Sequence, residues 1–195
     1  MRPLITCAFV TAAMLALTIA GLGQGQPVNK SKLMKQNAKS PPMETSVDIN
    51  GKQIWIAYHA PSVRGRKIFG GADALQPDGT IWRLGADYAT VIHTDAPLEI
   101  KRLAVPAGDY SLYIALDQGK WELIVNKQTG QWGINMDGST TDKPDMELGR
   151  VPLDMSKPAG PVEQLKIELT KAGGNRGKLD IAWADVNAST PFTVK

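Results

Sequence analysis

The chain has 195 residues, of which 43% are hydrophobic and 21% charged, a composition that suits one globular domain and excludes a wholly disordered chain. Its formal charge of +3 arises before residue 41, where five cations and no acid occur: Arg2, Lys30, Lys32, Lys35 and Lys39. The other 17 cations face 19 acids, so residues 41–195 carry −2. Because this part has no net basic field, we expect no nucleic-acid partner.

The first 25 residues have the features of an export signal. Arg2 gives a positive start, Leu4 to Leu22 is almost wholly apolar, and small residues follow. We predict a signal peptide over residues 1–25 and a periplasmic or extracellular location. A retained anchor is the alternative, since a spanning helix needs about 20 apolar residues. No charge directly follows the apolar run, so we expect no stable membrane span after processing.

The only cysteine, Cys7, lies inside the predicted signal. The processed chain then contains no thiol, which excludes disulfides, thiol catalysis and thiolate metal ligands. Its stability has to come from its core alone. An exported protein without cysteine fits a bacterial cell envelope better than a eukaryotic extracellular setting.

Residues 26–42 read QPVNKSKLMKQNAKSPP and are polar, rich in lysine and bounded by prolines. This composition predicts a flexible basic linker. Its lysines could hold the protein near an anionic membrane face, but a solvated tail is the favoured interpretation.

A regular pattern of short strands follows. Apolar residues alternate in 47–49 and 54–58, on either side of Asn50-Gly51, and this pattern predicts a hairpin with a two-residue turn. Further strands are expected at 80–84, 90–94, 98–105, 110–117, 121–127, 146–153, 164–171, 178–185 and 192–194.

The connections between these strands are rich in Gly, Pro, Asn and Asp, and no stretch of ten or more residues after the signal has a 3.6-residue apolar period. At most a short helical turn is expected, at Gly70 to Leu75. Without helices to cover parallel crossovers, residues 43–195 are predicted to form an all-β, single-domain antiparallel β-sandwich or a jelly-roll-like barrel.

Four motifs occur in a set order and spacing: APSVRGRKIFG from Ala60, WRLGA from Trp82, PAGDYSL from Pro106 and LDIAW from Leu179. Together they resemble the bacterial family catalogued as domain of unknown function 2911. The resemblance extends from about residue 40 to the end of the chain. It implies an exported single-domain β protein, and it implies no activity, cofactor or catalytic residue. One departure is residues 71–79, where the resemblance leads us to expect a shorter connection.

Cationic and aromatic side chains concentrate between Tyr58 and Ile92. The cations are Arg64, Arg66, Lys67 and Arg83. Guanidinium groups present a planar fork to carboxylate, sulfate or phosphate, so their convergence would form an anion pocket. The structural alternative is that they pin loops, by pairing with acids such as Asp87 or Asp73 or by binding carbonyls at strand ends. That alternative is favoured for Arg83, and both alternatives stay open for the loop arginines.

Exposed aromatic side chains would suit a glycan, because sugar rings stack on indole. Trp132 is the strongest candidate, since it lies in the glycine-rich run 129–133. Trp82, which directly precedes Arg83, is placed with it and Trp132 among the predicted ligand-binding residues. Tyr110 follows Gly108-Asp109 and is predicted to be a corner tyrosine whose hydroxyl bonds to the backbone.

Catalysis has weaker support in the sequence. His59 and His93 are the only histidines and supply at most half of a four-ligand zinc shell, so we expect no metal and no cofactor. The serine-elbow, phosphate-loop and zinc-protease motifs are absent. His59 is the candidate general base of a hydrolase.

The sequence therefore favours a cell-envelope binding module for a small anionic or glycan ligand. The predicted ligand-binding residues are Arg64, Arg66, Lys67, Trp82, Arg83 and Trp132. Two alternatives stay open: a hydrolase of envelope or extracellular substrates that uses His59, and a structural or interaction domain. Oligomeric state is also left open.

Overall fold

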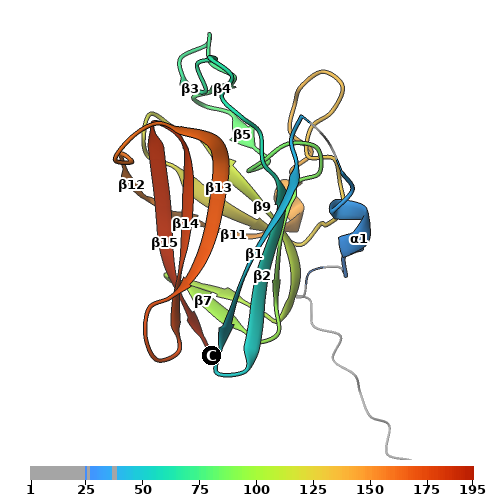
Figure 1. Ribbon diagram of the computed structural model, residues 1–195. Coiled ribbons are helices and arrows are strands. Elements are labelled where there is room, and N and C mark those ends of the chain that lie inside the picture. The colour runs from blue at the N-terminus through green and yellow to red at the C-terminus, as the bar shows by residue number, and fades with distance from the viewer. Residues whose placement is uncertain (1–24, 26, 37–38) are drawn as a thin grey trace, which may run out of the picture.

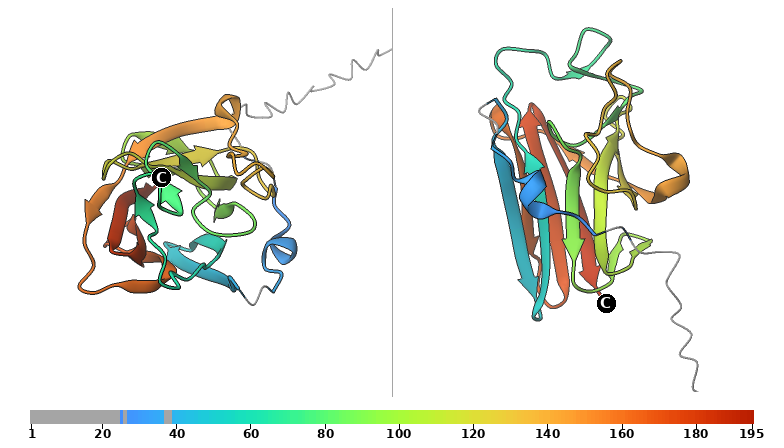
Figure 2. Two further views of the ribbon diagram at one scale, coloured as in Figure 1. Left: turned by 90° about the horizontal axis from the view of Figure 1, so that it is seen from above. Right: turned by 90° about the vertical axis from the view of Figure 1, so that its right-hand side faces the viewer.

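The computed structural model describes residues 25, 27–36 and 39–195. Two antiparallel sheets pack together, with the orange and red C-terminal strands facing the green and yellow strands (Figures 1 and 2). The prediction of an all-β sandwich is confirmed. Except for Gly25, the predicted signal peptide lies outside the described residues. No helix within the described part of the chain is long and apolar enough to cross a bilayer.

The first sheet has seven strands, in the order β1-β2-β6-β9-β10-β11, with β5 also paired to β9. Their bounds are β1 Pro42–Ile49, β2 Lys52–His59, β5 Ile81–Trp82, β6 Thr90–Thr94, β9 Gly108–Ala115, β10 Glu122–Asn126 and β11 Glu147–Pro152. Asn50 and Gly51 both have positive φ, 56° and 75°, and Ile49 pairs with Lys52. The predicted two-residue hairpin is therefore confirmed.

The second sheet has six strands, in the order β13-β14-β15-β7-β8, with β12 paired to β15. Their bounds are β7 Leu98–Ile100, β8 Leu103–Val105, β12 Asp154–Ser156, β13 Val162–Lys171, β14 Arg176–Ala184 and β15 Val186–Val194. The strand predicted at 98–105 is two strands, because the chain turns at Lys101 with φ of 53°.

Short elements complete the described chain. The parallel pair β3 (Phe69–Gly70) and β4 (Gln76–Pro77) extends beyond the end of the sandwich opposite the C-terminus (Figure 1). The helical turn expected at Gly70 to Leu75 is not a helix but a turn closed by a 2.9 Å bond from Ala74 N to Gly71 O. A helix, α1, covers Lys30–Leu33, and a 3-10 turn covers Pro144–Met146.

The core lies between the sheets and follows the alternation of the strands. On β14, Leu179, Ile181 and Trp183 are buried while their neighbours are more exposed. Trp183 stacks on Trp82 with ring centroids 5.5 Å apart. The hydroxyl of Tyr110 donates a 3.0 Å bond to Pro106 O, as the corner-tyrosine prediction requires.

The first sheet is also covered on its outer face, so β2 is buried from Ile54 to His59 instead of alternating. Residues 27–36, here called the N-terminal strap, place Leu33 against Trp55, Ala57 and Val91. Residues 127–146, here called the cover loop, bond through Gln131 and Thr141 to the hydroxyl of Tyr113.

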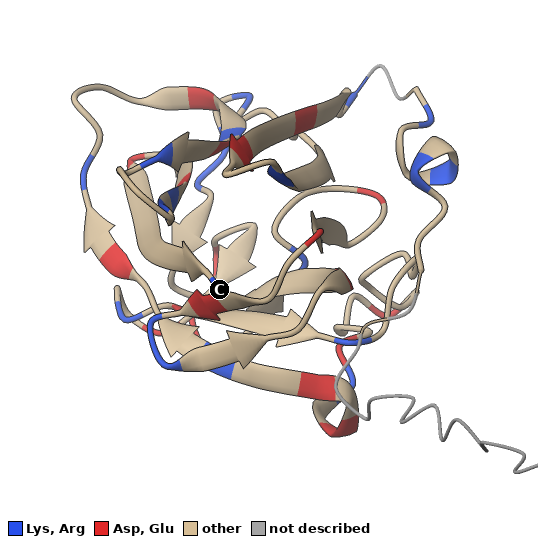
Figure 3. Cartoon of the chain, turned by 90° about the horizontal axis from the view of Figure 1, so that it is seen from below, with Lys and Arg blue, Asp and Glu red and all other residues tan. Residues whose placement is uncertain are grey.

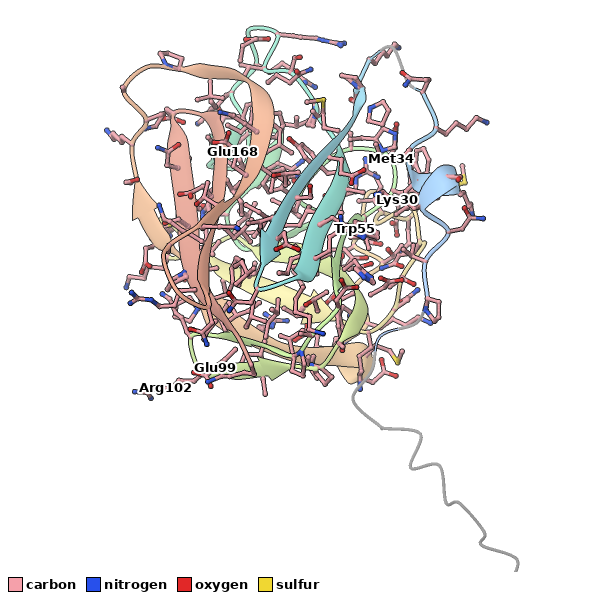
Figure 4. The ribbon with its side chains drawn as sticks, turned by 60° about the horizontal axis from the view of Figure 1, so that its bottom comes forward. Lys30, Met34, Trp55, Glu99, Arg102 and Glu168 are labelled. Carbon is pink, nitrogen blue, oxygen red and sulfur yellow. The ribbon has the colours of Figure 1, made fainter. Side chains whose placement is uncertain are left out.

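The strap belongs to the segment predicted as a flexible linker, and it contains a packed helical turn. Leu33 is only 4% exposed. Lys30 and Met34, at the two ends of α1, lie beside Trp55 of the first sheet (Figure 4). The apolar residues Val28, Leu33 and Met34 explain the packing, and composition alone gave them too little weight. The flexibility of this segment stays a prediction.

Candidate functional site

A cavity of about 490 Å³ lies at the end of the sandwich that carries β4 and β5. Its volume falls in the range of about 300–1,000 Å³ that is usual for small-ligand sites. Four cations line it: Lys39, Arg64, Arg66 and Arg83. No aspartate or glutamate of the described chain lines it. We call it the basic cavity; acidic and basic positions elsewhere are interspersed around the sandwich (Figure 3).

Arg64 lies in a tight turn after β2. It has φ of 49° and is followed by Gly65 with φ of 70°. The carboxylate of Glu163 accepts a 3.0 Å bond from the backbone N–H of Arg64, and this bond fixes the turn. The side-chain Nη2 of Arg64 donates a 2.7 Å bond to Lys39 O. The guanidinium is therefore oriented by a main-chain carbonyl.

Arg66 is held within its own turn. Its Nε donates to Val63 O at 3.0 Å and its Nη2 to Ser62 O at 2.7 Å. A guanidinium carries five N–H donors. These two bonds leave donors for a ligand while they restrict the side chain to one geometry.

Arg83 joins the loop after β5 to the cover loop. Its Nη1 donates to Asp87 O at 2.8 Å and to Trp132 O at 2.9 Å. Burial lowers the pKa of Arg83, and the nearby charge of Asp87 opposes that shift. The guanidinium stays charged at neutral pH, because an arginine pKa lies far above 7.

Among the described residues, none of these three arginines forms an ion pair with a carboxylate within 4.0 Å. Asp87 contributes its carbonyl to Arg83, and Asp73 pairs with Lys67. These contacts with main-chain carbonyls are the ones expected if the arginines hold loops in place. No carboxylate ion pair therefore neutralises these three positive charges at the cavity, although the charge of Asp87 lies near Arg83.

Lys67 does not line the basic cavity. Its Nζ lies 2.7 Å from Asp73 Oδ1, and both side chains are exposed. Asp73 belongs to residues 71–79, where the sequence resemblance led us to expect a shorter connection. The hydrogen bond from Lys67 lowers the pKa of Asp73. Lys67 therefore lies close to Arg64 and Arg66 in the sequence but does not join them at the basic cavity.

The two predicted tryptophans occupy different environments. Trp82 lines the basic cavity but is 2% exposed, and its indole N–H donates to Gly85 O at 3.2 Å. Trp132 is 48% exposed and lies outside the cavity lining. It contacts Tyr88 edge to face, and the guanidinium of Arg83 lies 5.8 Å from its ring centroid. Arg83 thus links this aromatic pair to the cavity.

His59 is buried beneath the strap, with 2% exposure. Its Nε2 lies 3.0 Å from Lys35 O, and because a carbonyl can only accept, this nitrogen is the donor. Asp87 Oδ2 lies 3.9 Å from the same nitrogen, too far for a hydrogen bond. The nitrogen that faces a carboxylate is therefore already engaged in holding the strap.

His93 lies in a polar cluster with Asp95 and Asp109, which the sequence did not bring together. Its Nδ1 is 2.6 Å from Asp109 Oδ1, and its Nε2 is 3.0 Å from Asp95 Oδ1. Burial lowers the pKa of His93, but the two aspartates outweigh burial and raise it overall. Asp109 also accepts a 2.7 Å bond from the backbone N–H of Val28. No set of three His, Cys, Asp or Glu side chains in the described ranges is arranged to hold a metal ion.

Several cavity residues were missed from the sequence. Lys39 comes from the chain just after the strap, Leu75 precedes β4, and Ile134 and Gly138 come from the cover loop. Nothing local to the turn Met136-Asp137-Gly138 indicates that Gly138 lines the same cavity as Arg64.

Fold and site together define an all-β sandwich domain with a basic cavity at one end. The chain belongs to the family described as "Protein of unknown function (DUF2911)", whose model matches residues 40–192. The resemblance inferred from the four motifs is therefore confirmed. No curated protein and no solved structure matches the chain. The matched range includes Arg64, Arg66 and Arg83 and begins after the strap.

Proposed function

We propose that this protein is an exported binding module that holds a small anionic ligand in the basic cavity. One observation carries the proposal. Arg64, Arg66 and Arg83 meet at a cavity whose lining has no carboxylate, and the groups that orient them are main-chain carbonyls.

The physical reason is charge compensation. A carbonyl dipole fixes a guanidinium but does not neutralise it, and a positive group at a low-dielectric wall attracts a counter-ion. An anion could accept the unused N–H donors in charge-assisted hydrogen bonds. Because the side chains are already oriented, binding would cost less conformational entropy than with free arginines.

Export is the second part of the proposal, and it rests on sequence. The positive start, the apolar run and the cysteine-free remainder support passage to the periplasm or the extracellular space. A ligand from that compartment would meet the cavity without crossing a further membrane.

Trp132 supports a glycan as the second candidate ligand. Its indole is 48% exposed and is steadied by Tyr88 and Arg83. An exposed indole of this kind suits the C–H face of a sugar ring. Since Trp132 lies outside the cavity lining, the anionic ligand is the better supported of the two.

The hydrolase alternative has less geometric support. To act as a general base, His59 would have to gain access to solvent through its Nδ1, because its Nε2 donates to Lys35 O and the ring is buried. Binding at the basic cavity requires no such change.

Thermal unfolding of residues 26–195 with phosphate, pyrophosphate, sulfate and citrate tests the proposal, because a ligand of the native state raises Tm by mass action. Arg66→Gln is the primary variant, since its bonds lie within its own exposed turn. Arg102→Gln is the matched control, because Arg102 follows β7 and lies near Glu99, away from β4 and β5 (Figure 4).

We expect at least one anion to raise Tm of the wild-type and Arg102→Gln proteins and to raise it less in Arg66→Gln. Equal shifts in all three proteins, or no shift with any anion, would overturn the proposal.

A further inference from the structure

We infer that the ligand of the basic cavity is an amphipathic organic anion, with its charged head at Arg64 and Arg66 and an apolar aryl or acyl part against Leu75, Ile81 and Ile134. This inference rests on the proposed function and narrows its ligand class.

The same cavity that holds the cations is lined by aliphatic side chains. Leu75, Ile81 and Ile134 all contribute to it, and none of the three is fully buried. Leu75 is 42% exposed, one of the few large hydrophobic residues at the surface of the described chain. The side chains that a ligand would meet are therefore apolar as well as basic.

The aliphatic residues are held in place by the backbone. The N–H of Leu75 donates a 3.0 Å bond to Lys67 O, which ties it to the chain leading into β3. Ile134 forms a bridge with Thr140, and Asn135 N donates to Ser139 O at 2.8 Å to close the turn between them. These main-chain bonds hold the segments that carry the exposed aliphatic side chains before any ligand binds. Little of the free energy gained by burying these side chains is therefore lost to ordering the protein.

Trp82 and Trp183 lie behind the cavity as a stacked pair, each at most 2% exposed. Indole rings packed this deeply offer a ligand an apolar backing. A hydrated inorganic anion would leave the exposed side chain of Leu75 in contact with water, whereas a ligand with an apolar part would cover it. A sugar phosphate would place hydroxyl groups against the aliphatic side chains, where they lose hydrogen bonds to water, although Ser40, Ser62, Gln76 and Thr80 also line the cavity.

Different elements supply the two kinds of group. Arg64 and Arg66 belong to the loop after β2, whereas Leu75 and Ile81 belong to the chain around β4 and β5 and Ile134 belongs to the cover loop. A ligand that fills a cavity of about 490 Å³ contacts both kinds of wall, and one that binds only to the guanidinium groups leaves the aliphatic wall unused.

Calorimetric titration of residues 26–195 with phenyl phosphate, inorganic phosphate and glucose 6-phosphate tests the inference, because the three share a phosphate head and differ in the attached body. Benzoate against acetate repeats the comparison with a carboxylate head. Leu75→Ser is the diagnostic variant. Met43→Ser is its matched control, since Met43 is 40% exposed and lies on β1, outside the cavity lining.

We expect phenyl phosphate to bind at least tenfold more tightly than inorganic phosphate, a difference of about 1.4 kcal/mol. Leu75→Ser should weaken phenyl phosphate about fivefold and leave inorganic phosphate unchanged, and Met43→Ser should alter neither. Equal affinity of wild-type protein for the two ligands, or a preference for glucose 6-phosphate, would overturn this inference and leave the proposed function standing. No binding of any of these anions would overturn this inference, and it would overturn the proposed function as well if pyrophosphate, sulfate and citrate also left Tm unchanged.

Discussion

Arg83 donates a 2.9 Å hydrogen bond to the carbonyl oxygen of Trp132, and its side chain passes directly over Gly133. A Cβ at Gly133 would lie 2.6 Å from Arg83 Cδ, and Gly133 has φ of 91°, a conformation that favours glycine. We predict that Gly133→Ala displaces Arg83 and lowers the free energy of unfolding by about 1–3 kcal/mol, as measured by urea denaturation.

Gly130→Ala separates the two causes. Gly130 has φ of 77° in the same cover loop but lies outside the cavity lining, and a Cβ there would meet nothing within 4 Å. It should therefore lose only the stability that backbone strain removes and should leave anion binding intact. If the two variants lost stability and binding equally, contact with Arg83 would not be the reason for glycine at position 133.

Much of the fold could be predicted because one face of most strands in the second sheet meets solvent. Alternation over Leu179 to Trp183 identifies β14 and its buried face directly. The outer face of the first sheet was less predictable, because the strap and the cover loop bury it and remove the alternation from β2. The break at Lys101 has no glycine or proline to mark it.

The candidate site could be predicted where its residues are close in sequence. Arg64, Arg66 and Arg83 fall within one short segment, and all three line the cavity. Ile134 could not be assigned, because only tertiary packing brings the cover loop to the segment. His93 and Asp109 are directly opposite each other on β6 and β9, and recognising that pair requires the strand register.

Protonation of His93 should stabilise the protein. Hydrogen bonds to Asp109 and Asp95 outweigh burial and raise its pKa above the ordinary value of 6.5. The folded protein therefore binds this proton more tightly than the unfolded chain does. The resulting stabilisation is fully present below pH 6.5 and is lost as the pH rises through the pKa of His93 in the folded state. We predict that the urea midpoint falls over this interval and that His93→Asn flattens the fall. An unchanged slope in His93→Asn would contradict this assignment.

Asp142 should affect stability in a lower pH window. Burial, followed by the carboxyl of Glu147, raises the pKa of Asp142 from 3.8 to about 6, although Asn126 donates to it at 2.7 Å. The folded state then holds a proton that the unfolded state releases, so stability falls as pH rises from about 4 to about 6. We predict that Asp142→Asn removes this fall and is more stable than wild type at pH 7, as measured by urea denaturation.

Asp137→Asn is the control for Asp142, because Asp137 lies in the same loop but is exposed and its pKa is lowered by hydrogen bonds from Ser139. It should keep the loss of stability between pH 4 and pH 6. If Asp137→Asn also removed that loss, or if Asp142→Asn retained it, a group other than Asp142 would be responsible for the loss of stability between pH 4 and pH 6.

The strap should open separately from the sandwich, because a few contacts hold it: the apolar side chains of Val28, Leu33 and Met34, surface contacts of Lys30 and Lys32, and two bonds to its main chain. Leu33 packs on Trp55, Ala57 and Val91, whereas His59 holds the strap through Lys35 O. We predict that Leu33→Ala loses about 1–2 kcal/mol of local stability, less than the roughly 2–5 kcal/mol of a full core site. Trypsin should then cleave the strap about 5–30 times faster, because cleavage follows the open population.

Ser31→Ala is the control for Leu33, because Ser31 lies in α1 and is exposed. It should leave the rate of strap cleavage unchanged. The urea midpoint of the sandwich should shift little in either variant, since undocking the strap breaks none of the pairs within the two sheets. A large loss of global stability in Leu33→Ala would mean that the strap unfolds only with the sheet that it covers. The strap would then be part of the cooperative core, and truncations that remove it would not yield a folded domain.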